Sequence, residues 1–357
     1  MRRLTVLQLL PALGSGGVER STLEIAAALV KAGHQSVVVS AGGRLVDPLQ
    51  RSGSEHIQID IGRKSLFTLR HVFALRRIVR QYQPDIVHAR SRLPAWLAWL
   101  ALRGRGAPRP HFVTTVHGLN SPGWYSSIMT RGERVICVSG SVRAHVLSHW
   151  PVVNPAKLVI IERGIDASHF CPAPGARPST AGPRRLLMPG RGTRLKGHEA
   201  ALKLLADLRG AGCDAHLCLL GTREPGREAY VEELESIARE LDVSDALEIS
   251  PPIHDVLSAY RHADLVLQLS AKPEAFGRTV VEALCVGTPV VGWNHGGVGE
   301  LLGQYFPEGQ VALGNRSALL ATTLSVLAQP RPAAPINPQS LAAMQAQTLK
   351  VYESLLA

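Results

Sequence analysis

The chain is poor in cysteine, in aromatic residues and in long apolar runs, and each shortage excludes a class of protein. Five cysteines with no C-x-x-C pair provide neither a disulfide framework nor a zinc cage, which favours a reducing compartment. Aromatic residues make up 5% of the chain, too few to suggest stacking platforms for nucleic-acid bases. The longest apolar run, residues 93–102, is too short to span a bilayer.

The length of 357 residues and the order of apolar patterns indicate two domains. Short strand-like runs alternate with helical patterns in both halves, which predicts two doubly wound, Rossmann-like α/β domains. A stretch rich in Pro, Gly and Ala at residues 170–183 separates them. The expected strands are 4–10, 35–40, 86–88, 111–116 and 135–138 in the first domain, and 186–188, 215–220, 246–249, 265–269 and 289–291 in the second.

Positive charge is concentrated in the first half of the chain. Residues 1–177 contain 23 Lys and Arg against 9 Asp and Glu, whereas residues 178–357 contain 16 against 19. A basic half of this kind suggests an anionic partner or an anionic membrane surface.

Residues 63–80 contain no acid, and their apolar residues recur at helical spacing. This pattern predicts a basic amphipathic helix. Two interpretations of it stay open. It is either a crossover helix with a solvated basic outer face, or a helix that docks on a membrane through Arg70, Arg76, Arg77 and Arg80.

The most informative residues are Glu274 and Glu282, which lie eight positions apart with Phe276-Gly277 just after the first. If a helix begins near Gly277, its free N–H groups face the loop that carries Glu274. Such a helix end binds phosphate, and the flanking carboxylates can hold hydroxyl groups. Strand-like runs on both sides predict the carboxyl edge of a parallel sheet, where such folds bind ligands. The segment favours a sugar-nucleotide site, although spaced glutamates alone also occur on ordinary solvent-facing helices.

A second pattern lies at residues 186–197, where an apolar strand runs into a Gly-rich loop with Arg191 and Lys196 five positions apart. Arg offers a planar fork and Lys a point charge to a diphosphate. Two cations in a loop can also be solvated surface groups. Together with the glutamate segment, they favour a donor-binding site.

With these motifs in this order, the chain resembles the retaining GT-B glycosyltransferases of family 4. The resemblance rests on Gly190-Arg191 with Lys196-Gly197, on Glu274 with Phe276-Gly277 and Glu282, and on Gly296-Gly297 before Glu300. It implies a GT-B fold, in which two Rossmann-like domains face a central cleft. An acceptor-side domain is expected at 1–175 and a donor-binding domain at 184–339, with a final helix at 340–357 that crosses back onto the first domain.

The resemblance also implies roles for the second domain's residues. Arg191 and Lys196 are expected to hold the donor diphosphate, and Glu282 to bond the nucleotide ribose. Glu274 is expected to bond hydroxyls of the donor sugar. Phe276 and Gly277 complete the donor-binding loop.

Two features of the first domain complete the expected site. Gly16 and Gly17 lie in a Gly-rich turn that opens a helix, where glycine lets the backbone approach a ligand, although the G-x-G-x-x-G spacing of dinucleotide sites is absent. The resemblance places this loop against donor phosphate and acceptor. His117 follows a strand-like run, and the resemblance places it near the donor sugar, although a histidine at a strand end is often a structural hydrogen-bonded group.

Arg90, Arg92 and Ser139 follow other strand-like runs of the first domain. They are candidate contacts for the acceptor.

The chain contains no Asp-x-Asp, the arrangement by which metal-dependent transferases hold a divalent ion on the diphosphate. We therefore expect a metal-independent enzyme without a cofactor. The resemblance implies retention of configuration, with the leaving phosphate as the base and no protein nucleophile.

The expected donor is a UDP-sugar, with GDP as the alternative base, because UDP is the commonest in the family. The basic first half favours an anionic glycolipid acceptor, such as lipopolysaccharide core or a related envelope glycan if the source is a Gram-negative bacterium. The expected location is cytoplasmic, peripherally associated with the inner face of the plasma membrane.

Two other functions stay open. A nucleotide-sugar epimerase would share the fold, but such enzymes need catalytic carboxylates in the first domain, whose nine acids form no clear cluster. A nucleic-acid-binding protein would explain the net charge of +11, but no recognised nucleic-acid motif is present.

Overall fold

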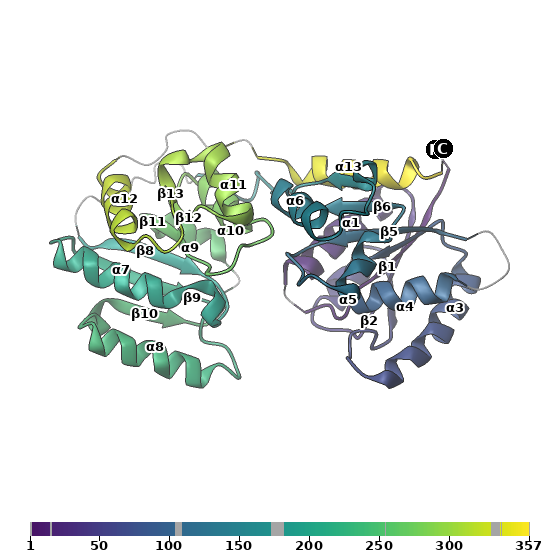
Figure 1. Cartoon of the computed structure of the whole chain (residues 1–357), viewed down its shortest axis with the longest axis horizontal. Helices are drawn as coiled ribbons and strands as arrows, with labels where there is room; N and C mark the ends of the chain where they lie inside the picture. Colours follow the sequence, from purple (N-terminus) through teal and green to yellow (C-terminus); the bar gives the residue numbers. More distant parts are fainter. Residues whose placement is uncertain are drawn as a thin grey trace. The chain divides into compact units, whose positions relative to one another are not determined.

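The computed structural model describes residues 2–14, 16–103, 109–172, 182–253, 255–329, 336 and 338–356. The chain divides into two compact units, which we call unit 1 (Met1–Gly164 with Leu341–Ala357) and unit 2 (Ile165–Ser340). Each unit contains one parallel sheet covered by helices (Figure 1). The doubly wound α/β class predicted from the sequence is confirmed. Most of the predicted linker, residues 173–181, lies outside the described part of the chain.

The sheet of unit 1 has seven strands in the order β3-β2-β1-β4-β5-β6-β7, and all neighbouring pairs are parallel. The five predicted strands are present, but β3 and β7 were not predicted, because one is only partly buried and the other has three residues. The strand order reverses between β1 and β4. The strands are β1 Thr5–Leu9, β2 Gln35–Ser40, β3 Glu55–Gln58, β4 Ile86–Ala89, β5 His111–Val116, β6 Arg134–Cys137 and β7 Leu158–Ile160.

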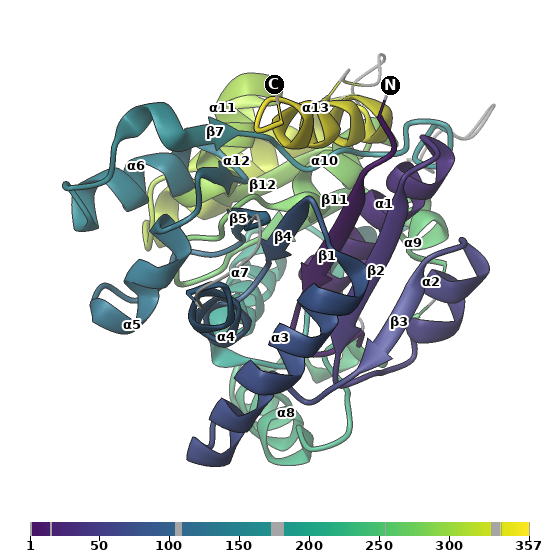
Figure 2. The ribbon, with the colours of Figure 1, turned by 90° about the vertical axis from the view of Figure 1, so that its right-hand side faces the viewer.

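Helices pack on both sides of this sheet (Figure 2). Helix α13 packs against α1, and Met344 and Tyr352 of α13 join Ile25 of α1 and Val6 of β1 in one apolar core. On the other side, α3 packs against α4. The helical elements are α1 Gly17–Lys31, α2 Val46–Arg51, η1 Leu66–Arg70, α3 His71–Tyr82, α4 Arg92–Leu102, α5 Trp124–Ser127, η2 Ile128–Thr130, α6 Gly140–His149, η3 Pro155–Lys157 and α13 Leu341–Glu353.

The basic helix predicted over residues 63–80 needs a correction. The segment forms a 3₁₀ turn, η1, followed by α3, which begins only at His71. Val72, Leu75 and Ile78 are buried, whereas Leu69 and Phe73 are exposed although they fit the same apolar pattern. The buried face is therefore narrower than the pattern suggested, because only a narrow stripe of α3 meets α4.

The sheet of unit 2 has six parallel strands in the order β10-β9-β8-β11-β12-β13. The five predicted strands are present, and the two-residue β13 was missed. The strand order reverses between β8 and β11, which is the topological switch point of this sheet. The strands are β8 Arg184–Pro189, β9 Ala215–Leu220, β10 Leu247–Ser250, β11 Leu265–Gln268, β12 Val290–Trp293 and β13 Gln310–Val311.

In unit 2, α7 packs against α8 and α12, while α10 packs against α9 and α11 (Figure 1). Within the described ranges, no helix is both long enough and apolar enough to cross a membrane. The helical elements are η4 Arg194–Lys196, α7 His198–Gly210, α8 Glu228–Glu240, η5 Ser244–Ala246, α9 Val256–His262, α10 Arg278–Cys285, α11 Gly296–Tyr305, η6 Pro307–Gly309 and α12 Arg316–Ala328.

Candidate functional site

The loops that follow β8 and β11 meet at the carboxyl edge of the unit 2 sheet, at its switch point. Gly197 makes this approach possible. Its φ is +83°, and a Cβ at this position would lie 1.8 Å from the carbonyl oxygen of Leu269. The Ala271 N–H donates to the Leu195 carbonyl at 2.8 Å. The two loops are therefore fixed against each other, as expected at a ligand-binding switch point.

These loops bring Lys196 and Glu274 into contact. Lys196 Nζ lies 2.6 Å from Glu274 Oε1, and Ser270 Oγ donates to the same oxygen at 2.5 Å. Both charged side chains are partly exposed, at 28% and 23% of their surface. The predicted diphosphate-binding cation and the predicted sugar-binding carboxylate thus lie side by side, open to solvent.

The helix predicted to begin near Gly277 is α10. Gly277 has a φ of +97°, and α10 starts at the next residue. The N-terminus of α11 holds the preceding loop, since the Gly297 N–H donates to the Glu274 carbonyl at 2.8 Å. A Cβ on Gly297 would lie 2.4 Å from the carbonyl oxygen of Phe276, which explains the glycine. The start of α10 therefore lies beside the Lys196–Glu274 pair, and its first N–H groups can accept an anion.

Glu282 lies inside α10 and is buried, with 6% of its surface exposed. The Tyr260 hydroxyl donates to its Oε2 at 2.9 Å, and Arg278 Nε lies 3.7 Å from its Oε1. This burial excludes the interpretation of Glu282 as an ordinary solvent-facing residue.

Arg191 follows β8 and is exposed. In the described part of the chain, its guanidinium makes no hydrogen bond or ion pair. A cation of this kind can bind an anion without first giving up another partner.

In unit 1, His117 lies directly after β5, and its Nδ1 contacts an Nη2 of Arg163. Arginine only donates, so Nδ1 must accept and the proton of the neutral ring must be on Nε2. His117 Nε2 is buried and has no hydrogen-bond partner among the described residues. The imidazole therefore presents an unused N–H donor at the carboxyl edge of this sheet.

The surroundings of His117 keep this ring neutral. Burial lowers the pKa of His117 well below its usual value, and the charges of Arg163 and Arg90 lower it further. A ring of this kind donates a hydrogen bond through Nε2, but it does not take up a second proton and become positively charged near neutral pH.

The comparisons with known proteins decide the family. The model of Glycosyltransferase Family 4 matches residues 15–169, and that of Glycosyl transferases group 1 matches residues 175–333. A solved glycosyltransferase from Rickettsia africae is 30% identical, with a TM-score of 0.86 over 100% of this chain and 99% of that one. The chain belongs to the glycosyltransferases.

Two other proteins show how far the similarity extends. Anabaena HepE, solved in complex with UDP and glucose, is 19% identical, with a TM-score of 0.79 over 99% of this chain and 100% of that one, and it shares the GT-B fold. The D-inositol 3-phosphate glycosyltransferase of Kineococcus radiotolerans is 25% identical over 249 residues, which are 62% of this chain and 56% of that protein. The chain spans only about half the length of the curated relatives it matches first.

Two residues of this glycosyltransferase that were predicted as acceptor contacts are buried. Arg90 is 3% exposed, and its Nε and Nη2 donate to Gln8 Oε1 at 2.8 and 2.6 Å. Ser139 is 2% exposed and caps α6 by accepting from the Val142 N–H at 3.1 Å. These contacts show that both residues have structural roles inside the fold, Arg90 by binding Gln8 and Ser139 by capping α6.

The other predicted residues of unit 1 are more open. Arg92 is partly exposed, donates to Ser126 Oγ at 3.1 Å and lies over the ring of Tyr125 at 5.4 Å. Gly16 immediately precedes α1, and Gly17 is its first residue. A Cβ on Gly17 would meet nothing within 4 Å, so there is open space at this helix start.

Sequence reasoning missed Arg163 and Ser21, which is buried in α1. Arg163 contacts both Ser21 Oγ and His117. The signal that could have found Arg163 is its position after β7, in Glu162-Arg163-Gly164. Because β7 has only three residues, it was not recognised as a strand.

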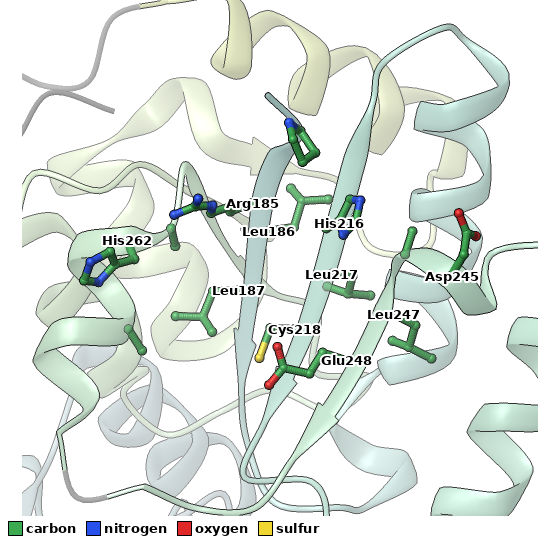
Figure 3. A pocket seen from close by; sticks show the side chains of 14 residues that line it. Arg185, Leu186, Leu187, His216, Leu217, Cys218, Asp245, Leu247, Glu248 and His262 are labelled. Carbon is green, nitrogen blue, oxygen red and sulfur yellow. The ribbon is translucent and has the colours of Figure 1, made fainter. Parts of the chain in front are cut away.

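A separate hollow of about 420 Å³ opens on the unit 2 sheet, over β8, β9 and β10 (Figure 3). Its lining includes Arg185 and His216, each the second residue of its strand. The hollow thus lies toward the amino ends of the strands, whereas Lys196 and Glu274 lie at the carboxyl ends. Within the described ranges, no group of three or more His, Cys, Asp or Glu residues is arranged to hold a metal ion.

The Arg163 contact predicts the protonation of His117. In the wild-type protein, nitrogen NMR is expected to find the proton on Nε2. In Arg163→Met, a charge that lowers the pKa is lost, so His117 should titrate closer to its usual value of 6.5. Arg51→Met, which removes an exposed arginine of α2, is the control and should leave the His117 signals unchanged. A wild-type ring protonated on Nδ1 would contradict the assignment.

Proposed function

We propose that this glycosyltransferase moves a sugar from a nucleotide-sugar donor to a hydroxyl of a glycan or glycolipid. The observation that carries the proposal is the Lys196–Glu274 contact beside the start of α10, at the switch point of unit 2. It combines a cation, a hydroxyl acceptor and the positive end of a helix, which are the groups a sugar diphosphate needs. The UDP and glucose bound to Anabaena HepE, a protein of the same fold, support this donor class.

Cleavage of the bond between sugar and diphosphate builds negative charge on the leaving phosphate. Arg191, Lys196 and the first N–H groups of α10 would stabilise this charge. In the free protein Glu274 balances Lys196, and an arriving diphosphate would give the lysine a second anionic partner. Because Arg191 and Lys196 can neutralise the charge of the diphosphate, they support the proposal that the reaction needs no metal ion.

Glu274 and Glu282 would bind donor hydroxyls. Glu274 already accepts from Ser270, and its second oxygen is the one that would accept from the sugar. Glu282 is held by Tyr260 in a buried position, which suits a carboxylate that binds the two hydroxyls of a ribose. His117 has its Nε2–H available to donate to an oxygen of a bound substrate.

The match to family 4 supports transfer with retention, in which the leaving phosphate takes the proton of the acceptor hydroxyl. The excess of Lys and Arg in residues 1–177 supports an anionic acceptor. We propose an envelope glycan, such as lipopolysaccharide core, and action at the inner face of the plasma membrane.

A thermal-shift screen with UDP-, GDP- and ADP-sugars tests the donor class. UDP-sugars are expected to stabilise the protein by about 2.7 kcal/mol at 100 times the dissociation constant, and equally in excess EDTA. Glu282→Ala should lose most of this shift, while Glu308→Ala, an exposed glutamate of η6, should keep it. No shift with any of the three donors, or a shift only with added Mg²⁺, would contradict the proposed donor site.

A further inference from the structure

Three large apolar side chains lie exposed within seven residues of unit 1. Phe67 is 80% exposed, Leu69 50% and Phe73 70%. The opposite face of α3 is buried against α4, so this segment is well packed on one side and bare on the other. Single exposed apolar residues are common on protein surfaces, but a group of this size marks an interaction surface.

The charged side chains within this segment of the sequence all have one sign. On α3, Phe73, Arg77 and Arg80 follow one exposed face at helical spacing, and Arg70 lies exposed just before the helix. The sequence has no acid between residues 61 and 84. Within the described ranges, Arg70, Arg77 and Arg80 form no ion pair.

Arg76 differs from these three arginines. Its Nε and Nη2 donate to the carbonyls of Ala101 and Leu100 at 3.3 and 3.2 Å, where they satisfy the end of α4. Arg76 is therefore a structural residue, and it is removed from the set predicted to touch a membrane.

The segment begins at the carboxyl edge of the unit 1 sheet. Helix α3 leads into β4, so it runs back along the sheet, and its first residues lie at the edge where the parallel strands end (Figure 2). His117 follows β5 at this same edge. The first residues of the exposed surface and the candidate catalytic histidine thus lie at one edge of one unit.

We propose that Phe67, Leu69, Phe73, Arg70, Arg77 and Arg80 form a docking surface for an anionic lipid bilayer. The apolar side chains enter the interface, and the three guanidinium groups contact the lipid phosphates. Charge complementarity favours lipid, because an acid-free segment with three exposed arginines and two exposed phenylalanines matches the negative headgroups and apolar interior of such a bilayer. Docking would bring the carboxyl edge of the unit 1 sheet to the bilayer, and a glycolipid acceptor would be anchored in the same membrane. This last point rests on the proposed transfer reaction.

The arginine and the apolar side chains are expected to differ in how their contributions to vesicle binding depend on salt concentration. Each arginine near an anionic surface is expected to change partitioning about fivefold, so that the three together contribute about 100-fold. Salt screens this part. The part contributed by Phe67, Leu69 and Phe73 comes from burial of apolar surface and resists salt.

Co-sedimentation with phosphatidylglycerol–phosphatidylcholine vesicles and with phosphatidylcholine vesicles alone, at two salt concentrations, tests the proposal. The wild-type protein is expected to bind only the anionic vesicles strongly. Changing Arg70, Arg77 and Arg80 to Gln should weaken binding about 100-fold at low salt. Changing Phe67, Leu69 and Phe73 to Ser should remove the binding that remains at high salt.

Matched controls use exposed residues elsewhere. Val152→Ser with Leu313→Ser removes exposed apolar groups, and Arg239→Gln removes an exposed arginine of α8. All control variants should bind as the wild type does. Binding at the wild-type level by both the arginine variant and the serine variant would overturn the proposal, and so would a wild-type protein that binds no vesicles. A dimer in light scattering that the serine variant abolishes would also overturn it, because the surface would then be occupied by a second copy of the chain.

Hydrolysis of the donor without acceptor separates this proposal from the proposed function. The docking variants should hydrolyse donor at the wild-type rate, because none of the altered residues belongs to the candidate donor site. Loss of vesicle binding with normal hydrolysis supports the docking surface. Normal vesicle binding in a protein that binds no nucleotide sugar would leave docking in place and refute the proposed function.

Discussion

Lys196→Ala is expected to lower kcat by a factor on the order of 10²–10³, with a smaller change in donor affinity. Charge on the leaving phosphate appears in the transition state, so a cation beside it acts mainly on turnover. The structure places Nζ of Lys196 at the switch point, 2.6 Å from Glu274, where the start of α10 can share the anion. Steady-state kinetics with a UDP-sugar, together with calorimetric donor binding, measures both effects.

The control is Lys203→Ala. Lys203 lies on α7 of the same unit and pairs with Glu199 at 2.6 Å, but it is outside the candidate site. Its loss should leave kcat unchanged. Lys196→Ala also leaves Glu274 without its cation, so the double variant with Glu274→Gln shows whether that unbalanced charge causes the loss. Near-wild-type turnover in Lys196→Ala would refute the role of this lysine.

Gly197→Ala is expected to destabilise unit 2 more than an ordinary glycine substitution. A left-handed backbone costs an alanine roughly 1–2 kcal/mol. At Gly197 the new Cβ would in addition lie 1.8 Å from the Leu269 carbonyl oxygen, which forces the backbone to move and adds about 1–3 kcal/mol. The free energy of unfolding from urea denaturation measures the sum, and kcat should also fall because the loop carries Lys196.

Gly212→Ala is the matched control for this substitution. Gly212 lies two residues after the end of α7 with a φ of +81°, close to the +83° of Gly197, but a Cβ there would meet nothing within 4 Å. The difference between the two variants isolates the cost of the contact between the β8 and β11 loops. Equal destabilisation would mean that these loops do not constrain each other.

The strands and the second-domain site could be predicted because they depend on local signals. Short strand-like runs predicted β2, β5 and β9 with their observed bounds, and Gly277 with its neighbours predicted the start of α10. The spacing of five residues from Gly277 also places Glu282 inside this helix, but it does not show that Tyr260 holds it. The contact between Lys196 and Glu274 was not predicted, because it depends on the pairing of β8 with β11, which no local pattern contains.

The remaining features depend on packing between distant segments, which a local pattern does not contain. Leu69, Val72 and Phe73 fit one apolar face equally well, and only the position of α4 decides that Val72 is buried and the other two are exposed. Arg90 was misjudged for a similar reason. Gln8 lies 82 positions away in sequence, and no local pattern shows that it accepts the guanidinium.

Helix α13 has a consequence for the order in which the chain can fold during synthesis. Its residues Met344, Val351 and Tyr352 complete the core of unit 1, and the Tyr352 hydroxyl bonds His88 Nδ1 at 2.7 Å. The ribosome makes α13 only after all of unit 2, which is continuous in sequence. Domains usually fold in the order in which they are made. Here the first domain to be translated is the last to be completed, because the core of unit 1 lacks α13 until all of unit 2 has been made.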